Sequence, residues 1–263
     1  MGITVFPESP LSLNGLPRTS PEDFDLQVTN GQLAGHSCVH KFGHNDAVGS
    51  PEEDIWSVGG TLTWLEANTA LEVISTGNDT SAGSGARTIF IEGLDANFDP
   101  QTETVTLNAG TQATANSYTR INRAYVTSTG TYHGNNDNDI DIQVASGGAI
   151  QARIDAGQGQ TEKSHYTVRA GFTGCLLQYS ASVDATFASD VSLWQYQNAD
   201  DVSASFDGGR RLIGTSVGLV GSFRNTFRCY PRLPEKTDIW WTGLTSVSSA
   251  NVQATYDMFL VAN

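Results

Sequence analysis

Two imidazoles and a thiol near the start of the chain are the residues best suited to bind a metal ion. In an extended strand His36, Cys38 and His40 lie on one face, and imidazole with thiolate is a typical ligand set for zinc. These positions span about 13 Å along a strand, too far for one ion unless the chain curls. No CxxC or HExxH motif accompanies them. We therefore expect a solvated or interface-packed strand here, without metal.

A second cluster has the residue types of a calcium loop. Asp137, Asp139 and Asp141 alternate within a run of Asn and Asp. Calcium takes about six to eight oxygen ligands from a tightly turned loop, with glycine at its sixth position and glutamate at its twelfth. Counted from Asp137, the sixth residue is Ile142 and the twelfth is not a glutamate. The pattern favours a hairpin loop that enters a strand at Ile140.

Catalytic motifs find little support in the sequence. It contains no HExxH, GxxxxGK[ST] or GxGxxG motif. The Gly-rich run 83–87 leads into an expected strand, so no helix N-terminus follows it to hold a phosphate. The carboxylates of Glu52, Glu53 and Asp54 have the chemistry of a glycosidase acid pair, but three adjacent acids are more typical of a solvated turn. We predict a protein that is not an enzyme and uses no cofactor.

Aromatic side chains suggest a carbohydrate site. Trp194 and Tyr196 stand two apart on one expected strand and face the same side, whereas the adjacent Trp240 and Trp241 face opposite sides. Rings exposed on one face could stack on sugar rings. The other interpretation places Trp194 and one residue of the 240–241 pair in the hydrophobic core. Both interpretations stay open at this point.

The composition indicates which elements carry these residues. The 263 residues include 27 Gly, only 16% are charged, and the abundant Thr, Val, Tyr and Phe suit half-buried strands. Alternating patterns recur, as in 118–126 and in the expected hairpin 139–154, without alternation of helices and strands. We predict an all-β fold, an antiparallel and jelly-roll-like β-sandwich over residues 51–263.

The first 50 residues differ from the rest. Five of the eight prolines lie within the first 51 positions, and a residue without an N–H joins a central strand poorly. Apolar residues punctuate the segment and need a surface to lie on. We predict that residues 1–50 form an extended arm on the chain's own domain or on a neighbouring subunit, with candidate contacts at Ile3, Val5, Phe6, Leu11, Leu13 and Leu16.

Charge excludes several classes of partner. The 28 acidic and 14 basic residues give a net charge of −14, which disfavours nucleic-acid backbones and anionic membranes. No apolar run approaches the ~20 residues of a membrane span, and no secretory signal is visible. We expect neither nucleic acid nor membrane as a partner. The widely spaced Cys38, Cys175 and Cys229 indicate reduced thiols.

Several runs resemble a group of tailed-bacteriophage virion proteins. They are 89–98, 103–108 and 118–126, followed by 233–239 and 251–263, so the resemblance covers about residues 45–263. It implies a non-enzymatic structural component of the virion, assembled in the host cytoplasm. A capsid decoration or cement protein, bound through its arm to the major capsid protein or other virion proteins, is the first hypothesis. Cement proteins at three-fold points suggest, by analogy, a homotrimer rather than a dimer. The alternative is a tail- or fibre-associated protein that binds a host surface glycan.

Overall fold

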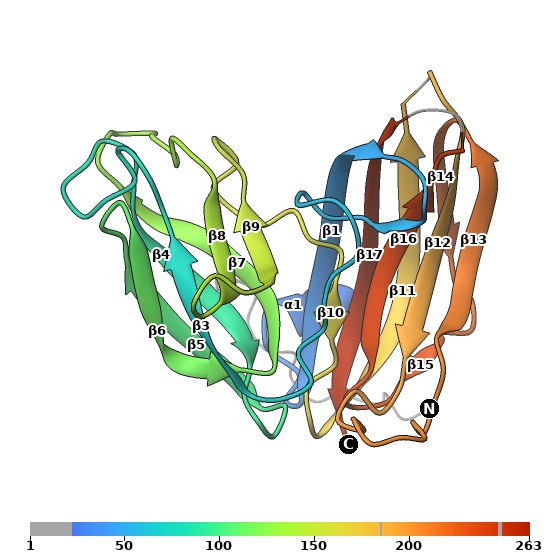
Figure 1. Cartoon of the computed structure of the whole chain (residues 1–263). Coiled ribbons are helices and arrows are strands. Elements are labelled where there is room, and N and C mark those ends of the chain that lie inside the picture. The colour runs from blue at the N-terminus through green and yellow to red at the C-terminus, as the bar shows by residue number, and fades with distance from the viewer. Residues whose placement is uncertain (1–22, 185, 247–248) are drawn as a thin grey trace, which may run out of the picture.

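The computed structural model describes residues 23–184, 186–246 and 249–263. This part of the chain forms seventeen strands and one short helix, and its strand ladders are antiparallel. The all-β, antiparallel prediction is thus confirmed. The strands do not form one jelly-roll-like sandwich, however, because they make two pairs of sheets with separate hydrophobic cores, side by side in Figure 1.

The first sandwich contains both ends of the described chain. One sheet has, in order, β1 (His36–Val48), β17 (Ala250–Ala262), β11 (Phe172–Val183) and β14 (Gly221–Thr226), with β15 (Arg232–Leu233) beside β11. The other has β10 (Tyr166–Thr167), β16 (Asp238–Leu244), β12 (Ser189–Tyr196) and β13 (Arg211–Leu219), with β2 (Glu53–Asp54) beside β16. Between them the alternate residues of β17, among them Val252 and Met258, pack with Leu193 and Trp241. The alternation of apolar residues thus marks the buried face.

The second sandwich is inserted between β2 and β10. One sheet has, in order, β6 (Thr111–Tyr118), β3 (Thr69–Ile74), β8 (Ile140–Val144) and β9 (Ile150–Ile154). The other has β5 (Pro100–Thr106), β4 (Ala86–Leu94) and β7 (Arg120–Thr129). Ile89 and Ile91 of β4 face Ile142 of β8 across a core of mostly branched aliphatic side chains. The expected 139–154 hairpin is confirmed as β8 and β9, and β8 begins at Ile140 as predicted.

The predicted arm is wrong for residues 36–48, which form β1. This segment has no proline and pairs with β17 from the His36–Val261 pair to the Val48–Ala250 pair, with one irregularity near its end. Its unbroken series of N–H donors allows it to join the sheet as an edge strand. Residues 1–22 lie outside the described residues, and with them the six candidate contacts at Ile3, Val5, Phe6, Leu11, Leu13 and Leu16.

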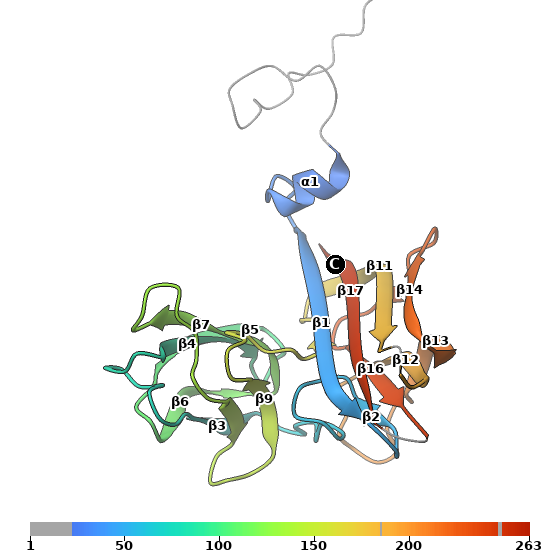
Figure 2. The same cartoon turned by 90° about the horizontal axis from the view of Figure 1, so that it is seen from above.

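The helix α1 (Phe24–Thr29) precedes β1 and projects beyond the strands in Figure 2. Val28 is its buried residue, and the ring of Phe24 packs edge-on against Phe259, with 5.3 Å between ring centroids. Nevertheless, Phe24 and Leu26 remain 47% and 46% exposed. Nowhere in the described ranges is there a helix with the length and apolar character to cross a membrane.

Candidate functional site

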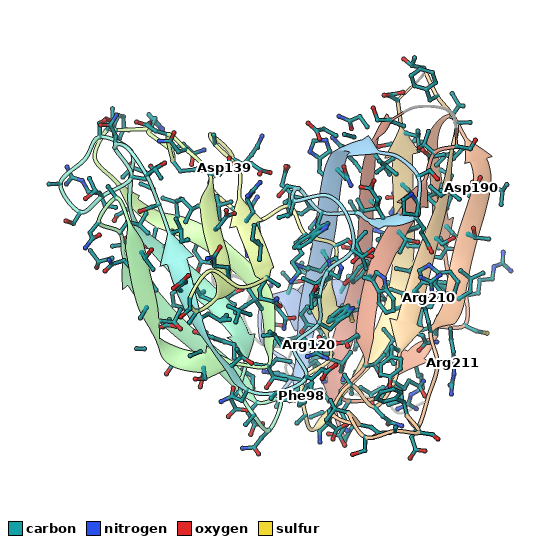
Figure 3. All side chains as sticks on the ribbon, viewed as in Figure 1. Phe98, Arg120, Asp139, Asp190, Arg210 and Arg211 are labelled. Atoms are coloured by element: carbon teal, nitrogen blue, oxygen red, sulfur yellow. The ribbon has the colours of Figure 1, made fainter. Side chains whose placement is uncertain are left out.

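The two sandwiches meet at a junction of buried polar side chains. Figure 3 places Arg120, the first residue of β7, between them. Its Nε and Nη2 each donate to the carboxylate of Asp238 at 3.0 Å. The remaining N–H groups donate to the carbonyls of Leu65, Thr119 and Ala199 at 2.7, 2.8 and 3.4 Å. All five donors of this 6%-exposed guanidinium are therefore used, and they join β7 to β16.

Two buried lysines extend the junction along β7. Lys163 Nζ donates to the carbonyls of Ile121 and Gln151 at 3.1 and 2.6 Å, and Lys41 Nζ donates to the carbonyl of Asn122 at 2.5 Å. Residues 120, 121 and 122 thus each bind a side chain from outside their own sandwich. Among the described residues, no carboxylate is hydrogen-bonded to either Nζ atom. Burial lowers the pKa of Lys41 to about 7 and that of Lys163 well below its usual range, with neighbouring cations adding to both shifts.

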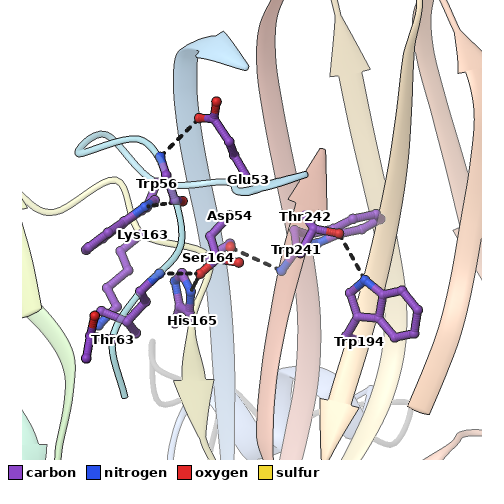
Figure 4. A network of polar contacts seen from close by, with 12 residues as sticks. Glu53, Asp54, Trp56, Thr63, Lys163, Ser164, His165, Trp194, Trp241 and Thr242 are labelled. Carbon is purple, nitrogen blue, oxygen red and sulfur yellow. Dashed lines mark hydrogen bonds and ion pairs between the residues drawn. The ribbon is translucent and has the colours of Figure 1, made fainter. Parts of the chain in front are cut away.

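A buried Asp–His pair fixes the connection that leads from β2 into the second sandwich. Figure 4 shows Asp54, which is 2% exposed, beside His165. Asp54 Oδ2 accepts from His165 Nε2 at 2.9 Å and from the Leu62 backbone N–H at 2.8 Å. Burial lowers the pKa of His165, against the opposing effect of Asp54, and the Nε2 proton is the one that faces Asp54. Asp54 therefore fixes both the 54–62 turn and the residue before β10.

The acids at 52–54 are a structural group rather than a solvated turn. Glu52 forms an ion pair with Arg210 at 2.9 Å and accepts from the Thr242 hydroxyl. Glu53 accepts from the backbone N–H groups of Gly49 and Gly60 at 3.3 and 3.0 Å. The prediction was wrong for Asp54, because β2 pairs with β16 and draws this carboxylate inside.

A close approach of backbones at Gly43 fixes this region and gives a first prediction. A Cβ there would lie 2.3 Å from the Ile55 carbonyl oxygen and 2.6 Å from the Ser164 nitrogen, atoms that hydrogen-bond to each other. We expect Gly43→Ala to lower the free energy of unfolding by about 3 kcal/mol, since the segments must separate. Gly209→Ala, where a Cβ meets no atom within 4 Å, is the control in urea unfolding. Equal midpoints for the two variants would refute the close approach.

The residues weighed as zinc ligands are engaged separately. His40 Nδ1 lies 2.5 Å from Asp257 Oδ1, and His36 Nδ1 lies 3.0 Å from the Ala34 carbonyl. Cys38 is an exposed thiol, whose pKa is raised by partial burial and by the charge of Asp257. Within the described ranges no three His, Cys, Asp or Glu residues are grouped to hold a metal ion.

The residues weighed as calcium ligands also have protein partners. Asp141 accepts two hydrogen bonds from Arg153 at 2.6 and 2.8 Å, and Asp139 accepts from the Ala156 N–H at 2.9 Å. Asp137 accepts from Asn78 Nδ2 at 2.8 Å. These carboxylates point to separate donors and tie the β8–β9 hairpin to its surroundings.

The four candidate stacking aromatics divide into two groups. Trp241 is fully buried in the first core, so the stacking prediction is wrong for it. Because Trp194 pairs with Trp240 in the β12–β16 register, both lie on the opposite face of that sheet. The ring of Trp194 is covered by the guanidinium of Arg210 at 3.7 Å. Tyr196 and Trp240 instead line a cavity with Trp64, a residue that sequence reasoning did not connect with them.

A GxSxG pentapeptide at 214–218 also escaped sequence reasoning. In α/β-hydrolases this motif makes a sharp strand-to-helix turn that exposes the serine. Here it lies inside β13, where Ser216 pairs with Val191, and a Cβ at Gly214 would lie 2.1 Å from the Tyr179 hydroxyl. The motif is therefore part of a strand and forms no nucleophile elbow.

Two cavities border the junction. One, of about 490 Å³, is lined by Lys41, Asn122, Arg123 and Tyr166 among others. The other, of about 350 Å³, is lined by Arg120 and Asp238 and by the aromatic rings of Trp64, Tyr196 and Trp240. The junction therefore holds the sandwiches together and also shapes both cavities.

Comparisons with known proteins leave this arrangement without a family. No family model matches the chain, and no curated protein matches it. Among solved structures, a chain in the structure of the infectious bursal disease virus Gt strain is 10% identical to this protein. The match covers 93% of this chain and 74% of the viral chain, with a TM-score of 0.22. The PBSX exported protein XepA is 13% identical over 98% and 100%, with a TM-score of 0.19. The VP2 subviral particle of infectious bursal disease virus is 11% identical over 88% and 76%, with a TM-score of 0.20. Scores this low assign no fold family.

Proposed function

We propose that the chain is a non-enzymatic structural component of a tailed-phage virion that decorates the capsid and binds it through its N-terminal segment. The observation that carries the proposal is the apolar surface of α1. Phe24 and Leu26 are each nearly half exposed on a helix outside both cores. In the sequence, a segment with six further apolar residues between positions 3 and 16 precedes them, separated by residues 17–23. Exposed apolar side chains next to an apolar-rich segment are best satisfied by a partner surface.

The resemblance of residues 45–263 to virion proteins supports the same proposal. The buried junction adds a physical reason, since a particle component benefits from two domains held in one fixed orientation. The proposal includes the major capsid protein as the partner and a trimer as the assembled form. Sedimentation of the purified chain at three times the monomer mass is the expected result for the trimer.

Deletion of residues 1–22 is expected to leave both sandwiches folded and to weaken binding to purified capsids by about a hundredfold or more. It removes the six apolar residues between positions 3 and 16, and burial of even two large apolar side chains contributes about 3 kcal/mol. Co-sedimentation with capsids measures the binding, and circular dichroism checks the fold. The deletion stops before α1 because Val28 is buried and Phe24 packs on Phe259, so that loss of the helix would disturb the fold.

A full-length variant, Phe24→Ser with Leu26→Ser, tests the exposed helix surface without shortening the chain. Tyr132→Ser, at an 89% exposed residue of the second sandwich, is the matched control and should bind as the wild type does. If the shortened chain binds capsids as tightly as the full chain, the anchoring role is refuted.

Copy number separates decoration from the tail or fibre alternative. Quantitative mass spectrometry of separated heads and tails should find the chain in the head fraction at a copy number comparable with the capsid protein. A few copies confined to tails would favour the glycan-binding alternative. Absence from both fractions would overturn a virion role.

A further inference from the structure

We infer that the 350 Å³ cavity at the junction binds a neutral oligosaccharide. Three aromatic residues from separate segments meet there: Trp64 from the β2–β3 connection, Tyr196 from β12 and Trp240 from β16. Leu65, Ala199, Val202 and Phe206 supply the rest of its apolar lining. The inference stands apart from the proposed function, because it depends only on what lines this cavity.

The aromatic rings are held in place by their neighbours. Trp64 packs edge-on against Trp240 and His165, with centroid separations of 5.6 and 5.3 Å. The guanidinium of Arg120 lies 5.0 Å from the Trp64 ring centroid. Rings that are already ordered offer apolar surface to a ligand at little cost in side-chain entropy.

The polar atoms of these rings are without protein partners. In the described ranges no hydrogen bond is made by Trp64 Nε1, Trp240 Nε1 or the Tyr196 hydroxyl, whereas the indole nitrogens of Trp56 and Trp194 donate to Gly60 and Thr242. A wholly apolar ligand would leave such donors unpaired, at about 1–3 kcal/mol each if they are buried. A saccharide satisfies both requirements, because its C–H faces pack on rings while its hydroxyl oxygens accept hydrogen bonds.

Charge at the cavity selects against anionic ligands. All five N–H donors of Arg120 are occupied, two of them by Asp238, so the lining has no cationic donor to offer. Glu66 and Asp201 add two carboxylates to the lining. A phosphate, a sulfate or the carboxylate of an acidic sugar would therefore be repelled without compensation.

A closed loop extends the cavity beyond the size of one sugar ring. Asp201 accepts from the backbone N–H of Asp207 at 2.6 Å, and Asn198 Nδ2 donates to the Asp207 carbonyl at 2.9 Å. The loop holds Val202 and Phe206 beside the cavity with 48% and 57% of their surface exposed. An exposed phenyl ring next to an aromatic cavity suits a second sugar unit, so the ligand is an oligosaccharide.

Titration of the full chain with four neutral trisaccharides tests the inference: maltotriose, cellotriose, mannotriose and N,N′,N″-triacetylchitotriose. We expect at least one to quench the tryptophan fluorescence and to bind with a Kd of about 1 mM or tighter in calorimetry. Lactose and 3′-sialyllactose form a neutral and acidic pair, in which any binding should be weaker for the acidic member. Failure of all four trisaccharides to bind at about tenfold higher concentration overturns the inference, as does equal or tighter binding of sialyllactose.

Variants that preserve the fold locate the binding. Tyr196→Phe removes one unpartnered hydroxyl and should weaken the best trisaccharide by about three- to tenfold. Tyr230→Phe is the matched control, because Tyr230 is exposed and lines a different hollow. Phe206→Ala should weaken the trisaccharide more than its monosaccharide. Unchanged affinity in both Tyr196→Phe and Phe206→Ala would place the sugar elsewhere and refute the assignment.

Discussion

Replacing Arg120 by methionine is expected to lower the free energy of unfolding by about 3–5 kcal/mol, the cost of breaking a buried ion pair from one side. Methionine fills much of the volume but has no N–H group. Of its partners in the described part of the chain, the carboxylate of Asp238 then keeps only the hydroxyl of Thr167, and the carbonyls of Leu65 and Ala199 lose their donor. The charge that remains is only 3% exposed.

The same substitution should also uncouple the two sandwiches. All five tryptophans lie outside residues 69–154, so their fluorescence reports on the first sandwich and the junction, whereas far-ultraviolet circular dichroism reports on both. In urea the wild type should show coincident transitions with the two probes. In Arg120→Met the two probes should separate, because each core then unfolds with less help from the other.

Controls distinguish the buried pair from a general loss of positive charge. Arg123→Met removes an exposed guanidinium that donates to Gln160 and should cost only about 0.5 kcal/mol. Arg120→Met combined with Asp238→Leu should recover more than half of the lost stability, since no charge is left unpaired. An Arg120→Met protein that unfolds at the same urea concentration as Arg123→Met would show that the pair does not hold the junction.

Strand positions were predictable because each depends on a local pattern. The alternation at 251–263 reappears in β17, with Val252, Tyr256 and Met258 buried, and the Ser146–Gly148 turn joins β8 to β9. Pairing partners were not predictable, since alternation carries no information about which strand lies beside which. The pairing of β1 with β17 joins residues about two hundred positions apart. The overall composition of the chain likewise does not indicate whether it forms one hydrophobic core or two.

For the candidate sites, too, residue types were predictable from local patterns, whereas contacts between distant segments were not. Tyr196 and Trp240 were found by their residue type and spacing, but Trp64 lines the same cavity only because a distant connection folds back to it. Arg120 stands at a polar position within an alternating run, where a charged residue normally faces water. It is buried only because the other sandwich covers that face. No signal within the run distinguishes it from the exposed Arg123.

Lys41 provides a pH-dependent test of the junction. The usual pKa of its ammonium is 10.5, and in the folded protein it is lowered to about 7, mainly by burial and in part by the nearby charge of Arg123, with Glu92 opposing both. Between these values the unfolded chain holds a proton that the folded chain releases, so stability rises with pH by about 1.4 kcal/mol per unit near the middle of the window. Below pH 7 both states are protonated and the gain is absent.

Comparison with Lys41→Met isolates this contribution, because other titrations are largely common to the two proteins. The unfolding free energy of the wild type minus that of Lys41→Met should increase by about 3–5 kcal/mol from pH 6.5 to 10.5. Arg123→Met should reduce the increase, since removing that charge raises the pKa of Lys41. Lys163→Met should show a rise of the same sign, because the pKa of Lys163 is also lowered by burial. A flat difference for Lys41→Met across this range would mean that the folded protein keeps Lys41 charged at the junction, and its hydrogen bond to Asn122 would then be that of an ammonium.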